Sequence, residues 1–541
     1  MNSRVPFSWL ALEKRLLGWA SAFLLLAWST ACLVDINHPP GVRYVRLTAL
    51  AVVLAIGWLE YAKPWYGFYA LLLIWPQELV VKDWLIRHAG ELWSSLPSIV
   101  GGPLAAVLAT AFWLRSRATA NKSVQPAARD PWLPAFRVSL WVLAASWVVS
   151  TAAFYVRYAA PMDGWVIVPV DPRRLLSPVP RSGLCPIFST LNYVPAFFLG
   201  LLLLNRLSSQ PEQHGTETSA AVAPVRRLLL CMAASGTIVT AEAFLQLTCG
   251  WRWPFDVSPP GGPFQHRNFL APVLVVAAVI TFLLSARLRS RYARASCVLL
   301  GLLQLAAACQ TGSRNGVFMV LMLACLVMCA RASWRKALFL LCGSVLLLCL
   351  MFWLPLPSAG SFSSEVPRRL LATLDYLRRG AWDDFLDLRL RFFGAALQIW
   401  RQYPVTGSGP NTFMMLTHPA AAFKGPFLAY GYPPVHAHNL PLHLLAELGP
   451  LAALSWTATW LIIPACALFK ARTGLAVALL LIGLGNVFDV SWYLNGMTTL
   501  SVVLIVLFCA ERRYEHRHPA TIIQPEHSGG PENACHAEAE H

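Results

Sequence analysis

Long apolar runs separated by short polar gaps make up most of the chain. A helix that crosses a bilayer needs about 20 mostly apolar residues, and runs of this length recur along the sequence. The pattern predicts an all-α polytopic membrane protein with about 12–14 transmembrane helices, because backbone groups inside a bilayer must pair within the same segment. The fourteen candidate spans are approximately 16–34, 45–62, 65–81, 96–114, 136–156, 187–205, 227–247, 269–286, 295–310, 315–330, 336–356, 440–469, 473–489 and 495–510.

The composition agrees with this fold class. Of the 541 residues, 57% are hydrophobic and 13% are charged, whereas soluble domains carry about 25% charged residues. A soluble enzyme is therefore excluded. The net charge of +17 does not indicate nucleic-acid binding, because many of the basic side chains lie in the short gaps, where they report membrane topology. The cysteines show no metal-type CxxC spacing, and Cys185 and Cys249 are the one candidate disulfide pair.

Basic residues in the gaps set the predicted orientation. With fourteen spans, five basic clusters and the basic N-terminus fall on one face, which should be cytoplasmic. The opposite face also holds four arginines, so the rule is followed only as a bias. Those four are Arg157, Arg173, Arg174 and Arg181, and the five clusters are Arg115, Arg117 and Lys122; Arg287, Arg289, Arg291 and Arg294; Arg331, Arg335 and Lys336; Lys470 and Arg472; and Arg512 and Arg513.

The predicted topology divides the chain into five segments. Residues 1–260 hold N-terminal transmembrane helices, and 261–356 hold transmembrane helices with polar motifs at their outer ends. A large extracytoplasmic, partly helical loop covers 357–438, and loops of this length are usually functional. Residues 439–510 hold the C-terminal transmembrane helices. The cytoplasmic tail, 511–541, is rich in His, Glu, Gly and Pro, a composition that predicts disorder.

The large loop contains an amphipathic helix, predicted at residues 381–403 by apolar residues at helical spacing. Arg389 falls within the apolar stripe, and Arg391 points to the opposite face. Burying an unpaired arginine is costly, so Arg389 needs an anionic partner. The partner is either an acidic side chain or a substrate phosphate, which suits the planar guanidinium. The acidic candidates are Asp383, Asp384 and Glu365.

A histidine-rich motif covers residues 436–449, where the loop enters a predicted span. Pro441 suits the first turn of that helix, which places His438 and Asn439 at a helix N-terminus that favours phosphate. Asn439, His443 and Glu447 form one polar stripe at i, i+4 and i+8, descending into the span. The stripe is either functional or an internal hydrogen bond from His443 to Glu447 that fixes packing. A zinc site of His436, His438 and His418 is a third interpretation, without diagnostic spacing.

Two shorter outer segments add polar groups to the same face. The turn at 311–316 carries Arg314, which is either an interface anchor or part of a site. The segment at 262–269 carries Arg267 and Asn268, and Asn268 is also a candidate helix cap. Glu242 and Asp489 lie near the outer ends of their spans and are candidate partners for these arginines. The glycine-containing turn GSGPNTF, at 407–413, is interpreted as a plain loop.

Taken in order, these motifs resemble the O-antigen ligase superfamily. The similarity covers 262–449 and rests on GPFQHRNFLAP, TGSRNG, the helix that bears Arg389 and ends at Pro404, GSGPNTF, and HNLPLHLLAELG. The resemblance implies an integral-membrane glycosyltransferase of the bacterial inner membrane, with its active site facing the periplasm. The donor would be a glycan on undecaprenyl pyrophosphate. The acceptor would be lipid A-core in a ligase, another lipid-linked glycan in a polymerase, or a protein.

The resemblance also implies roles for individual residues. His438 matches the essential histidine of the family, and Arg314 and Arg389 match the arginines near the pyrophosphate. Asn268 and Glu447 match the asparagine of the earlier turn and the end of the histidine motif, while Asn439 and His443 are expected in support. Histidine suits a general base, and arginines suit a leaving pyrophosphate, so no metal or other cofactor is demanded. The rival class is a non-enzymatic transporter of lipid-linked glycan, although no internal repeat is evident.

Overall fold

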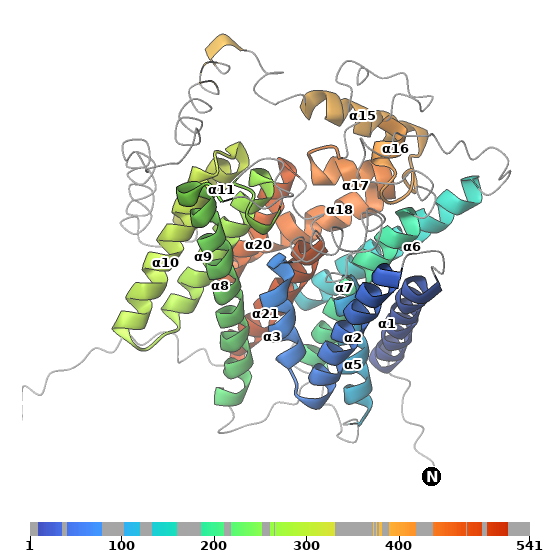
Figure 1. The fold of residues 1–541 in the computed structure, drawn as a ribbon, viewed down its shortest axis with the longest axis horizontal. Helices are drawn as coiled ribbons and strands as arrows, with labels where there is room; N and C mark the ends of the chain where they lie inside the picture. Colours follow the sequence, from blue (N-terminus) through green and yellow to red (C-terminus); the bar gives the residue numbers. More distant parts are fainter. Residues whose placement is uncertain are drawn as a thin grey trace, which may run out of the picture.

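The computed structural model is a bundle of helices, and its regular secondary structure is helical throughout the part of the chain that it describes (Figure 1). The bundle helices before the large loop are α1 (Trp9–Val34), α2 (Pro40–Ala62), α3 (Tyr66–Ile74), α5 (Gly102–Ala118), α6 (Trp132–Tyr158), α7 (Cys185–Ser209), α8 (Thr218–Cys249), α9 (Arg267–Ala286), α10 (Arg291–Gln310) and α11 (Arg314–Cys329), with short turns η1 (Trp75–Gln77) and η5 (Gly262–Phe264). The described residues are 9–34, 40–77, 102–118, 132–158, 185–209, 218–251, 260–264, 266–329, 372, 375, 378–380, 389–417, 436–471, 473–489 and 495–517.

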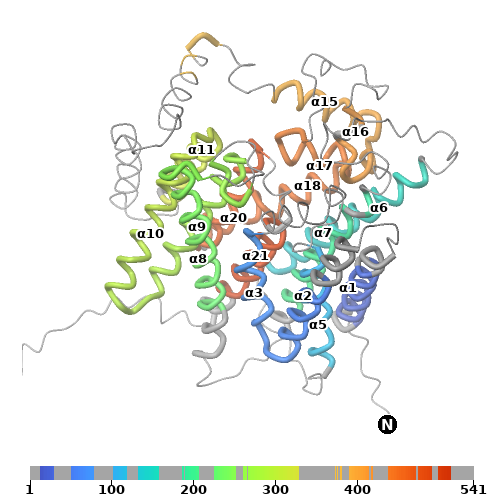
Figure 2. Tube along the Cα trace, viewed as in Figure 1, coloured from blue at the N-terminus to red at the C-terminus, as the bar shows by residue number. Residues whose placement is uncertain are grey.

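The C-terminal part adds the remaining helices. They are α15 (Arg389–Gln402), α16 (Phe413–Thr417), α17 (Leu440–Leu448), α18 (Pro450–Thr457), the π-helical turn η7 (Ala458–Ile462), α19 (Ile463–Ala471), α20 (Gly474–Val487) and α21 (Asn495–Arg517). In the tube view, α20 and α21 lie inside the bundle (Figure 2), where α20 contacts α9 and α21 contacts α7. Helices from both ends of the sequence therefore build one bundle.

Several helices are long and apolar enough to cross a membrane. Among the described residues, five helices meet both conditions, and four shorter helices are also apolar. These findings confirm the predicted all-α polytopic membrane fold. The predicted span at 336–356 and most of the 357–438 loop lie outside the described residues. The five long segments are Trp132–Arg157, Val225–Cys249, Arg267–Ala286, Arg291–Gln310 and Pro450–Lys470, and the shorter ones are Leu50–Ala62, Ser189–Asn205, Arg314–Val327 and Gly474–Val487.

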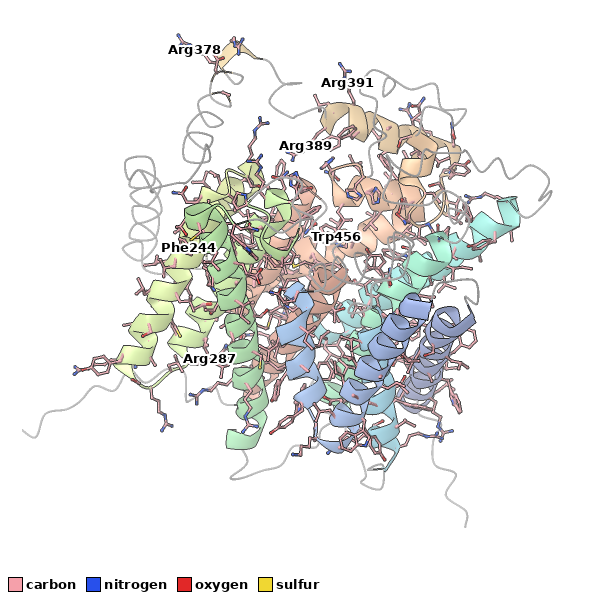
Figure 3. All side chains as sticks on the ribbon, viewed as in Figure 1. Phe244, Arg287, Arg378, Arg389, Arg391 and Trp456 are labelled. Atoms are coloured by element: carbon pink, nitrogen blue, oxygen red, sulfur yellow. The ribbon has the colours of Figure 1, made fainter. Side chains whose placement is uncertain are left out.

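The bundle has two chemically different ends. At one, which we call the basic end, Arg287 pairs with Glu511, and the Lys470 Nζ lies 5.7 Å from the centroid of the Trp132 ring. Figure 1 shows α15, α16 and α17 at the opposite end, which we call the motif end, and Figure 3 shows Arg287 far from Arg389. The structure thus separates basic gap residues from the predicted site residues, as the topology requires. The side of the membrane that each end faces stays a prediction.

The predicted span at 440–469 is not one continuous helix. The chain breaks at Gly449, whose φ of 85° ends α17, and Pro450 then starts α18. A side chain at Gly449 could not fit, because its Cβ would lie 2.2 Å from the carbonyl oxygen of Val405. The spanning stretch begins at Pro450. The stripe of His443 and Glu447 therefore lies in a separate short helix at the motif end and does not descend into the span.

The last helix is longer than the apolar pattern indicated. α21 continues to Arg517, seven residues past the predicted end of the span at 510. Glu511, placed in the tail by the sequence, accepts a hydrogen bond from Arg287. The rest of the predicted tail, 518–541, lies outside the described residues.

Candidate active site

The start of α17 is held by Asn439. Its Oδ1 accepts a hydrogen bond from the Leu442 backbone N–H at 2.9 Å, the arrangement of a helix N-cap, and its Nδ2 donates to the Val487 carbonyl at 2.8 Å. Pro441 stands in the first turn, as expected. Because Asn439 takes the Leu442 N–H and Pro441 has none, this helix end offers fewer donors to a phosphate than the sequence suggested. The predicted helix N-terminus is present, but the Asn439 side chain already accepts one of its free backbone N–H groups.

His438, directly before the cap, faces a buried carboxylate. Its Nδ1 lies 3.3 Å from Asp489 Oδ1, and the Asp489 side chain is 1% exposed. The backbone of His438 has a φ of 51°, in the left-handed region, and its ring stacks on Phe392 of α15 with centroids 5.4 Å apart. When Nδ1 carries the proton and donates it to Asp489, Nε2 is left as an acceptor. The arrangement can therefore orient a basic imidazole nitrogen.

Arg389 approaches the same carboxylate from α15. Its Nη2 lies 3.9 Å from Asp489 Oδ2, and its side chain is 13% exposed. Figure 3 shows Arg389 directed toward the bundle and Arg391 directed away from it, which matches their predicted opposite faces. The acidic partner is Asp489, about one hundred residues away in sequence, and the nearer candidates Asp383, Asp384 and Glu365 lie outside the described residues. The negative charge of the buried Asp489 carboxylate is therefore compensated by the Arg389 guanidinium and by the hydrogen-bonding ring of His438.

His443 and Glu447 form the contact that the packing interpretation predicted. His443 Nε2 lies 3.4 Å from Glu447 Oε2, and both side chains are buried. The ring of His436 is also close, with its centroid 5.9 Å from that of His443 and 6.1 Å from that of His438. Burial lowers the pKa of His443 well below its ordinary value of 6.5, and the neighbouring imidazoles of His436 and His438 lower it further. His443 is therefore a neutral side chain near neutral pH.

Glu447 has a role that the sequence did not reveal. Its Oε2 accepts the Asn411 backbone N–H, and its Oε1 accepts the Phe413 backbone N–H, both at 2.8 Å. One buried carboxylate thus holds the glycine-containing turn against α17. The motif HNLPLHLLAELG and the turn GSGPNTF are parts of one structure, and the turn is more than a plain loop.

The same turn closes the C-terminal end of α17. Ser408 N–H donates to the Ala446 carbonyl and Gly409 N–H to the Glu447 carbonyl, each at 2.9 Å. These helix-end carbonyls have no partner within the helix. Gly407 has a φ of 69°, and a Cβ there would lie 2.2 Å from the carbonyl carbon of Glu447. Glycine is therefore required both for the backbone conformation and for the close approach.

Arg157 of α6 fastens the turn from the other side. Its Nη1 donates to the Gly407 carbonyl at 2.7 Å, its Nη2 donates to the Thr406 hydroxyl, and its guanidinium lies 4.7 Å from the centroid of the Tyr403 ring. This arginine was an exception to the charge bias on the predicted outer face. The structure gives it a specific partner at the motif end.

The turn before Arg314 connects the start of α11 to the start of α9. Ser313 Oγ donates to Asn268 Oδ1 at 2.9 Å and accepts the Gly316 N–H at 3.3 Å, while Arg314 is the first residue of α11. Asn268 is not the helix cap, because His266 Nδ1 accepts the Asn268 N–H and caps α9. Asn268 instead links α9 to the Arg314 turn.

The candidate partner Glu242, the candidate disulfide and the zinc interpretation concern other parts of the predicted outer face. Glu242 accepts a hydrogen bond from Gln77 Nε2 at 2.7 Å, and Cys249 is a free thiol. Among the described residues, no group of three or more His, Cys, Asp or Glu side chains is arranged to hold a metal ion. His418, the third ligand of the zinc interpretation, lies outside them.

A comparison with family models finds a similarity over part of the chain. Residues 299–457 match the model described as O-antigen ligase. This segment is therefore similar to the O-antigen ligase family. The O-antigen ligase segment includes Arg314, Arg389, His438 and Glu447, whereas Asn268 and Asp489 lie outside it. The match supports a membrane glycosyltransferase of the ligase or polymerase type. No curated protein sequence matches the chain.

Proposed function

We propose that the protein transfers a glycan from an undecaprenyl-pyrophosphate donor to an acceptor hydroxyl, as an O-antigen ligase-like enzyme. The observation that carries this proposal is the pairing of His438 with one carboxylate oxygen of buried Asp489, while Arg389 lies near the second oxygen. An oriented imidazole beside a guanidinium supplies a base and a cation at one place. These are the two groups that transfer from a pyrophosphate-linked sugar requires.

In the proposed reaction, His438 Nε2 removes the proton from the acceptor hydroxyl. The acceptor oxygen attacks the anomeric carbon of the donor sugar, and the bond from that carbon to the pyrophosphate oxygen breaks with inversion. The leaving pyrophosphate keeps the bonding electron pair. Arg314 and Arg389 stabilise its negative charge, and Asp489 holds His438 in the tautomer that leaves Nε2 free to accept the proton. The arginines make a metal ion unnecessary for this step.

The motif end would face the periplasm of the bacterial inner membrane, where lipid-linked glycans are presented. The positive-inside rule supports this orientation, because the opposite end of the bundle carries Arg287 and Lys470. The acceptor would be lipid A-core. A second lipid-linked glycan, as in an O-antigen or exopolysaccharide polymerase, and a protein hydroxyl are the alternatives within the same chemistry.

The mechanism is tested with purified full-length protein, undecaprenyl-pyrophosphate-linked O-antigen as donor, and lipid A-core as acceptor. His438→Ala should lower transfer by about two to four orders of magnitude while donor binding persists, because both arginines remain. His436→Ala is the matched control, since it removes a neighbouring imidazole and leaves the pair of His438 and Asp489 in place. Full activity in His438→Ala, or loss of wild-type activity in EDTA with recovery in zinc, contradicts the mechanism.

The acceptor and the rival class are tested in the same assay. Replacing lipid A-core by a second lipid-linked repeat, or by a hydroxyl-bearing peptide, identifies a polymerase or a protein glycosyltransferase through the product formed. A non-enzymatic transporter would move the donor across sealed vesicles without any change in its glycan. Donor translocation without a transfer product would therefore refute the enzymatic proposal.

A further inference from the structure

Two asparagine side chains hold the last turn of α20 from different parts of the chain. Asn439, beside His438, donates to the Val487 carbonyl at 2.8 Å. Asn315, beside Arg314, donates from Nδ2 to the Gly485 carbonyl at 3.2 Å. Both carbonyls belong to the last turn of a helix, where no intrahelical N–H is available to them. Each amide therefore fills a position that the helix itself leaves open.

The position of this turn decides the position of Asp489. Asp489 lies two residues after the end of α20, and its carboxylate contacts both His438 and Arg389. Asn439 fixes the turn relative to the histidine motif. Asn315 fixes it relative to the first turn of α11, which begins at Arg314. The last turn of α20 thus links Asp489 to both the histidine motif, which carries His438, and the turn that carries Arg314.

The hydrogen bond from Asn315 to Gly485 lies in a closely packed contact between α11 and α20. The Asn315 side chain is buried, and Phe318 on the next turn of α11 packs edge-on against Phe488 with ring centroids 4.5 Å apart. A Cβ at Gly485 would lie 2.6 Å from Met319 Sδ, so the Met319 side chain would have to shift to make room for it. The glycine lets α11 come close enough for a short amide to reach the α20 backbone.

Only one orientation of the Asn315 amide makes this hydrogen bond. A carbonyl accepts hydrogen bonds, so the group that faces Gly485 must be the NH₂. Oδ1 has no hydrogen-bond partner among the described residues. Leucine has nearly the same shape and would satisfy packing alone. The amide is therefore explained by its donor to the α20 carbonyl.

We propose that Asn315 is a positioning residue for glycan transfer, which couples the Arg314 turn to Asp489 through the last turn of α20. This inference rests on the proposed function. Asn315 does not contact the reacting groups in this scheme. Its removal would let Asp489 and Arg314 shift relative to each other, and a displacement of about 1 Å at a catalytic group can cost about a hundredfold in rate.

The test compares two buried asparagines. Asn315→Leu removes the donor that joins α11 to α20, whereas Asn205→Leu replaces a buried asparagine of α7 whose side-chain amide has no hydrogen-bond partner among the described residues. Transfer of undecaprenyl-pyrophosphate-linked O-antigen to lipid A-core is measured with the full-length protein, together with the thermal unfolding temperature. Asn315→Leu should lower kcat by about 10- to 100-fold with little change in the donor KM. Asn205→Leu should leave kcat close to that of the wild type.

A double-mutant cycle separates positioning from general stability. If Asn315 acts through Asp489, adding Asn315→Leu to Asp489→Asn should lower kcat by less than about threefold further, because contacting or coupled sites are not additive. Asn315→Ser, which shortens the side chain without adding apolar bulk, should repeat the effect of Asn315→Leu. Independent, multiplicative losses in the cycle contradict the proposal.

Other results overturn the inference without touching the proposed function. A wild-type kcat in Asn315→Leu contradicts the inference. Loss of folded protein in both Asn315 variants but not in Asn205→Leu also contradicts it, because Asn315 would then contribute to stability alone. Failure of the proposed function looks different, because the wild-type protein would then give no transfer product at all.

Discussion

Replacing Glu447 by glutamine tests whether one carboxylate holds the glycine-containing turn. Glu447 is fully buried, and each of its oxygens accepts one backbone N–H at 2.8 Å, from Asn411 and from Phe413. Glutamine has nearly the same shape but offers one oxygen and one NH₂. One of the two backbone N–H groups would then face another donor.

The size of the effect follows from these two bonds. A hydrogen bond to a charged group contributes about 1.5–3 kcal/mol, and a buried donor left unpaired costs about 1–3 kcal/mol. We therefore expect the turn to be held about 2–3 kcal/mol less strongly in Glu447→Gln. Since about 1.4 kcal/mol is a factor of ten, the equilibrium for local opening of the turn should rise about 30- to 140-fold.

Hydrogen–deuterium exchange of the backbone amides measures this opening directly. In purified protein, the peptide that covers residues 404–417 should exchange about 30- to 140-fold faster in Glu447→Gln than in the wild type. Glu511→Gln is the matched control, because Glu511 pairs with Arg287 at the basic end. Unchanged exchange in Glu447→Gln, or an equal increase in Glu511→Gln, would refute the assignment of Glu447 as the anchor of the turn.

Three further predictions concern the arginines, the neutral histidine and the topology. Arg389→Lys should lose most transfer activity while the protein level is kept, because a lysine does not reproduce the guanidinium fork. Arg391→Ala should lower transfer activity only slightly, and equal losses in the two variants would contradict this prediction. His443 has a lowered pKa in the folded protein, so the unfolded chain binds more protons as pH falls below about 6.5, and the unfolding temperature should drop from pH 7.5 to 5.5 less steeply in His443→Asn than in the wild type. Reporter fusions after Arg294 should give a cytoplasmic signal and those near Gly425 an external one, and a cytoplasmic signal near Gly425 would exclude the proposed site.

The membrane fold could be predicted because its cause is local. Each spanning helix must satisfy its backbone within itself and expose apolar side chains to lipid, so the hydropathy of one segment is enough to indicate it. The break at Gly449 could not be found in this way. It depends on the approach of the Val405 backbone, which comes from a distant part of the chain and leaves no mark on the hydropathy pattern.

The candidate residues could be named from the sequence, but their partners could not. Arg389, in the apolar stripe of its helix, was expected to need an anionic partner, and the structure provides one. The acidic candidates named for Arg389 lie close to it in sequence, whereas its partner in the structure is Asp489, which follows the end of a later helix. Glu447 was placed in a polar stripe with His443, and that contact is present, but its bonds to Asn411 and Phe413 depend on a turn more than thirty residues earlier.

The short length of α17 explains why these distant partners matter. A helix of nine residues is marginal in isolation, and the break at Gly449 separates it from the spanning helix that follows. Its placement must come from contacts at its ends, where Asn439 joins it to α20 and the Glu447 carbonyl accepts hydrogen bonds from the Ser150 hydroxyl of α6 and from the Gly409 N–H. His438 precedes the first of these ends. Any change that loosens either attachment should therefore move the proposed base relative to Asp489 before it unfolds the bundle.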